Sequence, residues 1–156
     1  MTSCAAPAYR GRDEARLVEV VRRLAFCVVV GNGDAHLKNW SLIYRNKKMP
    51  VLSPVYDSVS TAPYVPIGES EDLGPKFAGS KRFANVNRAS FAASQNHLQR
   101  RLPEIRTNLA DVAMHAVEEV RSHWPEHEAE LAKSPEPRRE IDDWVDFHST
   151  RLLRSR

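Results

Sequence analysis

The sequence predicts a mainly α-helical protein with one small β-hairpin in its first half. Apolar residues recur at spacings of three and four in 17–28, in 109–120 and in 141–152, which is typical of helices with one buried face. Between the first two of these segments, two short apolar runs flank a polar turn, a pattern that favours a hairpin. At 156 residues, the chain is long enough to bury a core of its own.

The first predicted helix follows a short N-terminal segment. Residues 1–12 lack a periodic pattern and are predicted to be disordered. Asp13 is the expected N-cap, and the helix after it is expected to stop at Gly31. The folded part of the chain is therefore predicted to be residues 13–156.

A hairpin is predicted next. Residues 40–44 and 49–52 are the expected strands, with a polar turn at 45–48. Such a hairpin would return Asp57 to the loop that precedes the first strand. Residues 58–82 are rich in Ser, Pro and Gly and are predicted to form a long loop.

Three helices are predicted in the second half. Asn87 or Asn85 is the expected cap of the first, and the periodic segment 109–120 forms the second. Ser134 followed by Pro135 predicts the start of the third, because Ser suits the cap and Pro suits the first turn.

Composition and charge indicate an ordinary globular domain and select no partner. The chain is 42% hydrophobic and 28% charged, and its net charge of +3 gives no reason to expect direct nucleic-acid binding. The two cysteines, Cys4 and Cys27, indicate neither a disulfide framework nor a thiolate metal site, so a cytoplasmic location is expected. The apolar run 24–30 is too short to span a bilayer, so no membrane association is expected.

Three residues around the predicted hairpin have side chains suited to phosphoryl transfer. Asp34 and Asn39 lie five residues apart, and Asp57 follows the hairpin. Protein kinases use this arrangement: a catalytic Asp, a metal-binding Asn five residues later, and a second metal-binding Asp beyond a short turn. The alternative is that all three are common turn residues without chemistry. Nearby, Tyr56 is expected to pack against the fold and Asn32 to support the turn.

The residue types in and around this motif are more specific than its spacing. The string Asn-x-Asp-x-His-x-Lys-Asn at 32–39, followed by Pro-x-Tyr-Asp at 54–57, resembles the HipA family of bacterial serine/threonine kinase toxins. The stretch 73–79 is also similar to that family. The resemblance covers about 17–124 and is expected to continue to the C-terminus, so residues 13–156 are the implied C-terminal, mostly helical lobe of a kinase-like fold, with the hairpin beside the catalytic loop.

The resemblance implies a role for each residue. Asp34 is the implied catalytic residue, Asn39 and Asp57 the implied Mg²⁺ ligands, and His36 and Lys38 the implied contacts to the ATP cofactor. His36 could instead fix the loop by a hydrogen bond, and Lys38 could balance Asp34 or be solvated. The implied substrate is a hydroxyl group of a protein.

Part of a complete kinase is missing from the pattern. The six glycines form neither a Gly-x-Gly-x-x-Gly nor a Walker-type cluster, so the N-terminal nucleotide-binding lobe is expected to be absent. The isolated chain is therefore expected to bind ATP weakly and to transfer little phosphate. A gene fragment, one half of a kinase whose N-terminal lobe is encoded separately, and an inactive binding module all fit these features.

Two further alternatives stay open at this point. The resemblance implies a HipB-like, DNA-binding antitoxin as a partner, so the chain could be a non-catalytic member of a toxin–antitoxin pair. It could also be a metal-dependent hydrolase that uses Asp34, His36 and Asp57, although no further ligand-spaced His or carboxylate accompanies them.

Overall fold

A computed structural model describes residues 7–44, 50–61, 64–65, 72–127, 130, 133 and 135–155. Its main helices are α1 (Pro7–Val30), α2 (Arg88–Gln99), α3 (Leu109–His123) and α5 (Pro135–Arg154). Its strands are β1 (Leu42–Tyr44), β2 (Pro50–Leu52), β3 (Asp72–Phe77) and β4 (Ser80–Arg82). Short 3-10 turns are η1 (Leu37–Asn39), η3 (Phe83–Asn85) and η4 (Trp124–His127). The predicted mainly α class with a small hairpin is confirmed.

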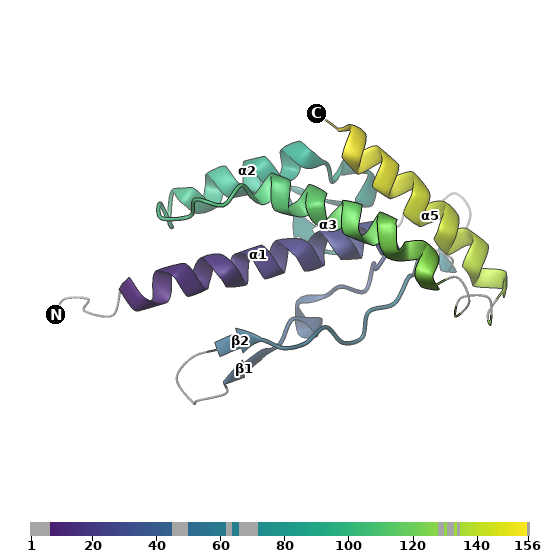
Figure 1. Ribbon diagram of the computed structural model, residues 1–156, viewed down its shortest axis with the longest axis horizontal. Coiled ribbons are helices and arrows are strands. Elements are labelled where there is room, and N and C mark those ends of the chain that lie inside the picture. The colour runs from purple at the N-terminus through teal and green to yellow at the C-terminus, as the bar shows by residue number, and fades with distance from the viewer. Residues whose placement is uncertain are drawn as a thin grey trace.

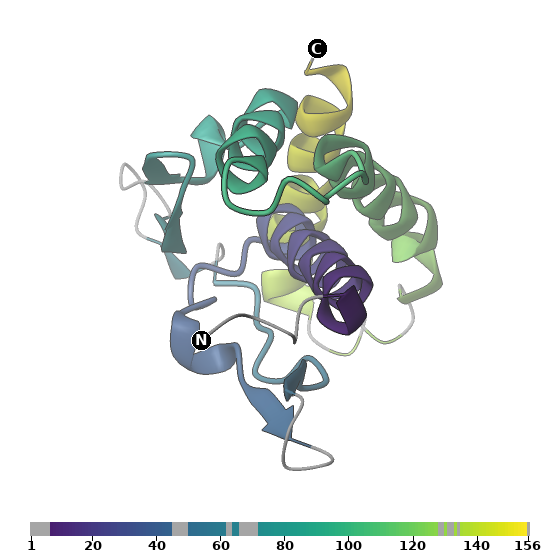
Figure 2. The same ribbon diagram turned by 90° about the vertical axis from the view of Figure 1, so that its left-hand side faces the viewer.

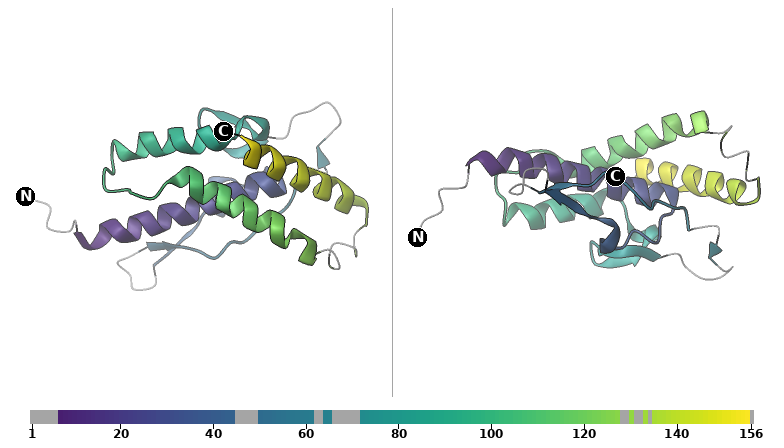
Figure 3. Two further views of the ribbon diagram at one scale, coloured as in Figure 1. Left: turned by 45° about the horizontal axis from the view of Figure 1, so that its top comes forward. Right: turned by 90° about the horizontal axis from the view of Figure 1, so that it is seen from below.

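The helices form one bundle, and the strands lie beside it. α1 and α3 run side by side, α2 lies along α3, and α5 contacts both α1 and α3 (Figure 1). The end-on view shows the helices grouped together and the strands gathered on one side of α1 (Figure 2). Seen from below, the β1–β2 hairpin covers the side of α1 that faces away from α2 (Figure 3).

The core is formed by the apolar faces of the bundle. It contains residues from α1, α2, α3 and α5, together with Leu73 from β3 and Phe83 from η3. Phe83 packs edge-on against Trp144 with ring centroids 5.4 Å apart, and the Trp144 indole donates to the backbone oxygen of Val28 at 3.3 Å. α5 thereby covers the carboxyl end of α1, the end from which the site loop emerges.

The start of α1 differs from the prediction, and its end agrees. α1 begins at Pro7, so Asp13 is inside the helix and residues 7–12, predicted to be disordered, are helical. Pro is well tolerated in a first turn, and 8–12 contain no residue that must stop a helix. At the other end Gly31 has φ 70°, and the Asn32 N–H donates to the Cys27 oxygen at 2.8 Å. This is the glycine-terminated helix end that the sequence predicted.

Asparagine caps fix the starts of α2 and α3. Asn87, one of the two predicted caps, accepts from the Ser90 N–H at 2.9 Å while the Ser90 hydroxyl accepts from the Asn87 N–H at 3.2 Å. Asn108 caps α3 by accepting from the N–H groups of Ala110 and Asp111. α5 starts at Pro135 as predicted, and Ser134 lies outside the described residues.

The predicted hairpin is confirmed, and the predicted long loop is partly wrong. β1 and β2 pair antiparallel with Leu42 opposite Leu52, and the predicted turn 45–48 lies outside the described residues. Within 58–82, β3 and β4 form a second antiparallel hairpin. Ala78 and Gly79 both have positive φ, as a tight two-residue hairpin turn requires. The buried side chain of Leu73 anchors β3 in the core, which composition alone did not reveal.

Across these described ranges, no helix has the length and apolar character needed to cross a bilayer.

Candidate active site

The loop after α1 is shaped by local backbone hydrogen bonds. The His36 N–H donates to the Asp34 oxygen at 2.7 Å, and the Asn39 N–H donates to the His36 oxygen at 2.8 Å, closing η1. The indole of Trp40 donates to the backbone oxygen of Ala35 at 3.1 Å. Ala35 is buried while Asp34 and His36 are exposed, so one small apolar side chain anchors a loop whose polar groups face outward.

Asp34 and Asn39 are joined directly. The side-chain amide nitrogen of Asn39 donates to the backbone oxygen of Asp34 at 2.8 Å. This bond uses the nitrogen of the amide. The oxygen of the same amide, which is the atom that would bind Mg²⁺, does not take part in it. The His36 ring nitrogen Nε2 lies 3.5 Å from Asp34 Oδ1, and both side chains are about half exposed. His36 thus lies near the Asp34 carboxylate, and its predicted role in fixing the loop stays a prediction.

The return segment after β2 is held against the loop by Tyr56. Its hydroxyl donates to the Lys38 backbone oxygen at 2.8 Å and lies 2.5 Å from the hydroxyl of Ser41. Tyr56 was predicted to pack, and instead its ring is partly exposed and its hydroxyl makes polar contacts. The backbone of Lys38 is thus part of the site, while its side chain is exposed.

Asp57 follows Tyr56 in an unusual backbone conformation. Its φ is 52°, in the left-handed region that non-glycine residues seldom occupy and that Asp and Asn tolerate best. Such strained residues occur most often at functional sites, where the surrounding contacts hold them in place.

A second set of hydrogen bonds holds the segment that follows Asp57. The Thr61 N–H donates to the Gly31 oxygen at 2.8 Å, and the Thr61 hydroxyl donates to the same oxygen at 3.0 Å and accepts from the Gly33 N–H at 2.8 Å. The side-chain nitrogen of Asn32 lies 3.4 Å from the hydroxyl of Ser58. Residues 58–61 are therefore held against 31–33, which brings Asp57 back to the loop of Asp34.

Gly74 of β3 supports the loop from behind. A Cβ atom at this position would lie 2.8 Å from the carbonyl carbon of Ala35 and 2.9 Å from the nitrogen of His36. Only glycine permits this approach of two backbones. Residues 73–77, the first part of the stretch 73–79 that resembles the family, therefore have a structural role: they belong to the strand β3, which supports the site loop.

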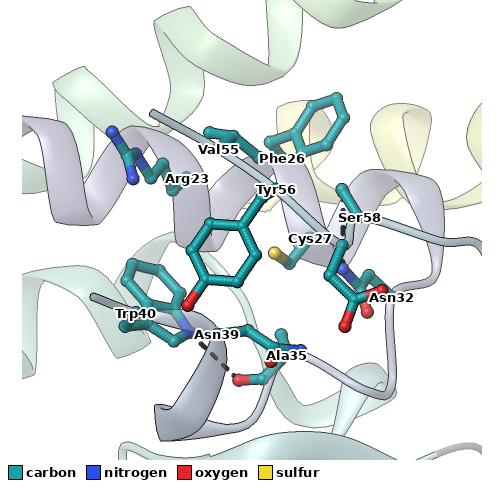
Figure 4. A pocket seen from close by; sticks show the side chains of 11 residues that line it. Arg23, Phe26, Cys27, Asn32, Ala35, Asn39, Trp40, Val55, Tyr56 and Ser58 are labelled. Atoms are coloured by element: carbon teal, nitrogen blue, oxygen red, sulfur yellow. Dashed lines mark hydrogen bonds between the residues drawn. The ribbon is translucent and has the colours of Figure 1, made fainter. Parts of the chain in front are cut away.

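Asn39 and Asp57 share one small pocket between α1 and the return segment. It is lined by Arg23, Phe26, Cys27, Asn32, Ala35, Asn39, Trp40, Val55, Tyr56, Asp57 and Ser58 (Figure 4). The space for water-sized groups is about 30 Å³, enough for an ion or a water molecule but not for a nucleotide. Asp34, His36 and Lys38 are not among the lining residues. The predicted site residues therefore form two groups: a pocket pair, Asn39 and Asp57, and a rim group, Asp34, His36 and Lys38.

Arg23, Cys27 and Asn32 are among the lining residues that were not predicted as site residues. Arg23 projects from α1, where its Nε donates to Glu19 at 2.6 Å. Burial raises the pKa of the Cys27 thiol to about 11, so Cys27 is a neutral wall residue rather than a metal ligand. Asn32 is almost fully buried. Arg23 and Cys27 are four residues apart and therefore lie on the same face of α1 near its carboxyl end. This spacing was the sequence signal that could have identified these two residues.

The hydrolase alternative gains no support from the geometry. Among the residues that the structure describes, no three His, Cys, Asp or Glu side chains are grouped closely enough to hold a metal ion. Asp34, His36 and Asp57 thus do not form the carboxylate and imidazole cluster that such a hydrolase requires.

The fold is mainly helical with small hairpins, and comparison with known proteins gives the family. Residues 3–127 match the family model of the HipA-like C-terminal domain. The chain is 38% identical over 136 residues to a protein of Sinorhizobium fredii named "Putative kinase Y4dM", covering 86% of this chain and 31% of that protein. It is also 44% identical over 52 residues to a "Putative kinase" of Haemophilus influenzae, covering 33% of this chain and 15% of that protein. The chain belongs to the HipA-like C-terminal domain family.

The fold agrees with this assignment. HipA of Shewanella oneidensis, in a toxin–antitoxin complex with HipB and operator DNA, matches with a TM-score of 0.56 and 21% sequence identity over 87% of this chain. The match covers 30% of that HipA chain. The chain thus spans about a third of the length of the Sinorhizobium fredii protein and of the Shewanella oneidensis HipA chain.

Proposed function

We propose that the chain supplies the catalytic and metal-binding groups of a HipA-like serine/threonine protein kinase, which transfers the γ-phosphoryl group of Mg·ATP to a protein hydroxyl. The observation that carries the proposal is that Asn39 and Asp57 line one pocket while Asn39 is hydrogen-bonded to Asp34. Asn39 and Asp57, which are 18 positions apart in the sequence, are thus close in space, and this supports the assignment of Asp34, Asn39 and Asp57 to a phosphoryl-transfer site.

Asp34 has the exposure that its proposed role needs. Its carboxylate is about half exposed at the rim, where a substrate hydroxyl can approach. The carboxylate orients the hydroxyl and accepts its proton as the hydroxyl oxygen bonds to the γ-phosphorus and the bond to the ADP oxygen breaks. His36, 3.5 Å from Oδ1 of Asp34, holds the carboxylate in this outward position.

The pocket pair fits Mg²⁺ in its donor chemistry. Asn39 offers a neutral oxygen whose amide is fixed through its nitrogen, and Asp57 offers a charged oxygen from a constrained backbone. Mg²⁺ commonly takes only one or two carboxylates from the protein and its other ligands from phosphate and water. When bound, the ion would offset negative charge on the phosphates.

Nucleotide binding is proposed to need a second part of the kinase. The pocket is too small for a nucleotide, and Lys38 and His36 provide the rim groups proposed to contact the phosphates. Beside this rim, large apolar side chains of η1 and β1 are exposed, and we call them the exposed strip: Leu37, Leu42, Ile43 and Tyr44. A two-stranded hairpin with such a surface is marginally stable in water alone. We propose that a nucleotide-binding lobe covers the strip.

A HipB-like antitoxin is the second candidate for a partner. HipA of Shewanella oneidensis occurs with HipB in its complex, and the exposed strip offers contact surface of the kind that a protein partner could use. This alternative predicts binding without phosphoryl transfer. The two partners are distinguished by whether the assembled complex binds Mg·ATP.

The site assignment is tested by phosphate transfer in the complex with the nucleotide-binding lobe. Asp34→Asn and Asp57→Asn should each lower transfer to a protein substrate at least about 100-fold, because each removes a charge required in the transition state. Asp143→Asn, an exposed carboxylate on α5, is the matched control. Retained transfer in both site variants would contradict the assignment.

Calorimetric titration of the chain alone with Mg·ATP tests the need for a second lobe. We expect binding too weak to reach micromolar affinity. Micromolar binding by the chain alone would show that no further lobe is required.

A further inference from the structure

Asn32 is a buried polar residue whose oxygen has no partner among the described residues. Its side chain is 3% exposed, and its nitrogen Nδ2 lies 3.4 Å from the Ser58 hydroxyl. The oxygen Oδ1 is buried and makes no hydrogen bond. Buried polar atoms without a partner are rare in native proteins, because the lost contact with water is not replaced. A bound water molecule or a cation would satisfy this oxygen.

The backbone places Asn32 in the wall of the pocket. Gly31 turns the chain out of α1, and the Asn32 N–H is held by the Cys27 oxygen at 2.8 Å. Asn32 lines the same pocket as Asn39 and Asp57. Figure 4 shows it beside Ser58, across the pocket from Trp40.

The chemistry of the three residues selects a cation. Asn32, Asn39 and Asp57 line one space of about 30 Å³, and each side chain can offer an oxygen. Arg23 lines the same pocket, and its charge is paired with the Glu19 carboxylate at 2.6 Å. A hard divalent ion with retained water satisfies such a set, whereas an apolar or anionic group does not.

We infer that Asn32 is a third protein oxygen of the cation site, with Oδ1 facing the ion or a water molecule bound to it. This inference rests on the proposed Mg²⁺ site and adds a residue to it. A purely structural role would need only the Nδ2 contact to Ser58 and would leave Oδ1 unexplained.

The experiment measures Mn²⁺ binding to the whole chain by NMR, without nucleotide and without an activity assay. Mn²⁺ broadens signals close to it, so even weak binding is seen at the side-chain amide of Asn39 and the backbone amide of Asp57. Asn32→Leu should weaken the binding at least fivefold. Asn32→Asp should tighten it at least threefold, because a charged oxygen of the same size replaces a neutral one. The controls are Asn96→Leu and Asn96→Asp on exposed Asn96 of α2.

The outcomes distinguish a failure of the Asn32 inference from a failure of the proposed cation site. If Asp57→Asn abolishes the broadening while both Asn32 variants bind like the wild type, the cation site stands and the inference is overturned. If the wild type and Asp57→Asn show the same broadening, the proposed site itself fails and the inference fails with it. If Asn32→Leu does not fold, tighter binding by Asn32→Asp supports the inference, and unchanged or weaker binding overturns it.

Discussion

In the helical bundle, α1, α2, α3 and α5 bury apolar side chains against one another, whereas the site segment, residues 31–44 and 50–61, is held by hydrogen bonds and leaves large apolar side chains exposed. The bundle holds its shape by packing, and the segment holds its shape by resting on the bundle. The consequence is that stability and proposed chemistry lie in different parts of the molecule. Variants of the site segment can therefore be studied in a chain that stays folded.

The largest expected effect comes from the same substitution made in the two regions. Leu152 on α5 is fully buried, and Leu37 on η1 is 79% exposed. Leu152→Ala should lower the free energy of unfolding by about 2–5 kcal/mol, because it leaves a cavity in the core. Leu37→Ala should change it by less than about 0.5 kcal/mol. Urea unfolding followed by circular dichroism measures both, and equal losses would refute the division into bundle and segment.

A smaller effect is expected where the two regions meet. Gly74→Ala puts a Cβ atom 2.8 Å from the Ala35 carbonyl carbon, so the strand or the loop must move. We expect a loss of about 1–3 kcal/mol, with NMR shifts at residues 33–36. Gly79→Ala is the matched control: its φ is 88° but nothing lies within 4 Å, so it should strain the turn without moving the loop. Unmoved signals at 33–36 in Gly74→Ala would show that β3 does not support the loop.

The smallest effect concerns acid stability of the bundle. His148 stacks on Trp144 with ring centroids 4.2 Å apart, and its Nδ1 lies 3.1 Å from a guanidinium nitrogen of Arg151. Burial, with a further contribution from the Arg151 charge, lowers the pKa of His148 to about 4. The unfolded chain takes up a proton near pH 6.5 and the folded chain only near pH 4, so stability should fall as the pH drops from 6.5 to 4 and level off below.

The loss assigned to His148 should be about 1–2 kcal/mol. Urea midpoints at pH 7, 5.5 and 4.5 measure it, with His148→Phe as the variant that cannot take up this proton. The same fall in His148→Phe as in the wild type would show that other groups cause the acid sensitivity.

The predictions from the sequence were correct where residues close together in the sequence decide the structure. Gly31 ends α1, Asn87 caps α2, and the polar turn between two apolar runs gives the β1–β2 hairpin. The prediction failed at 7–12 and within 58–82. In the second case, Ser, Pro and Gly indicated a loop, but burial of Leu73 and the tight turn at Ala78 and Gly79 produced a hairpin.

The sequence by itself determined the family of the chain and the residues that carry its proposed chemistry, because a helix stop, a five-residue spacing and a short hairpin are all encoded locally. Only the tertiary structure decided which groups meet. The hydrogen bonds that Thr61 donates to Gly31 and Tyr56 donates to Lys38 return Asp57 to the loop, and β3 supports that loop through Gly74. These are contacts between segments distant in the sequence, and no local pattern records them. The buried oxygen of Asn32 became visible in the same way, because burial is a property of the folded chain and not of the residue.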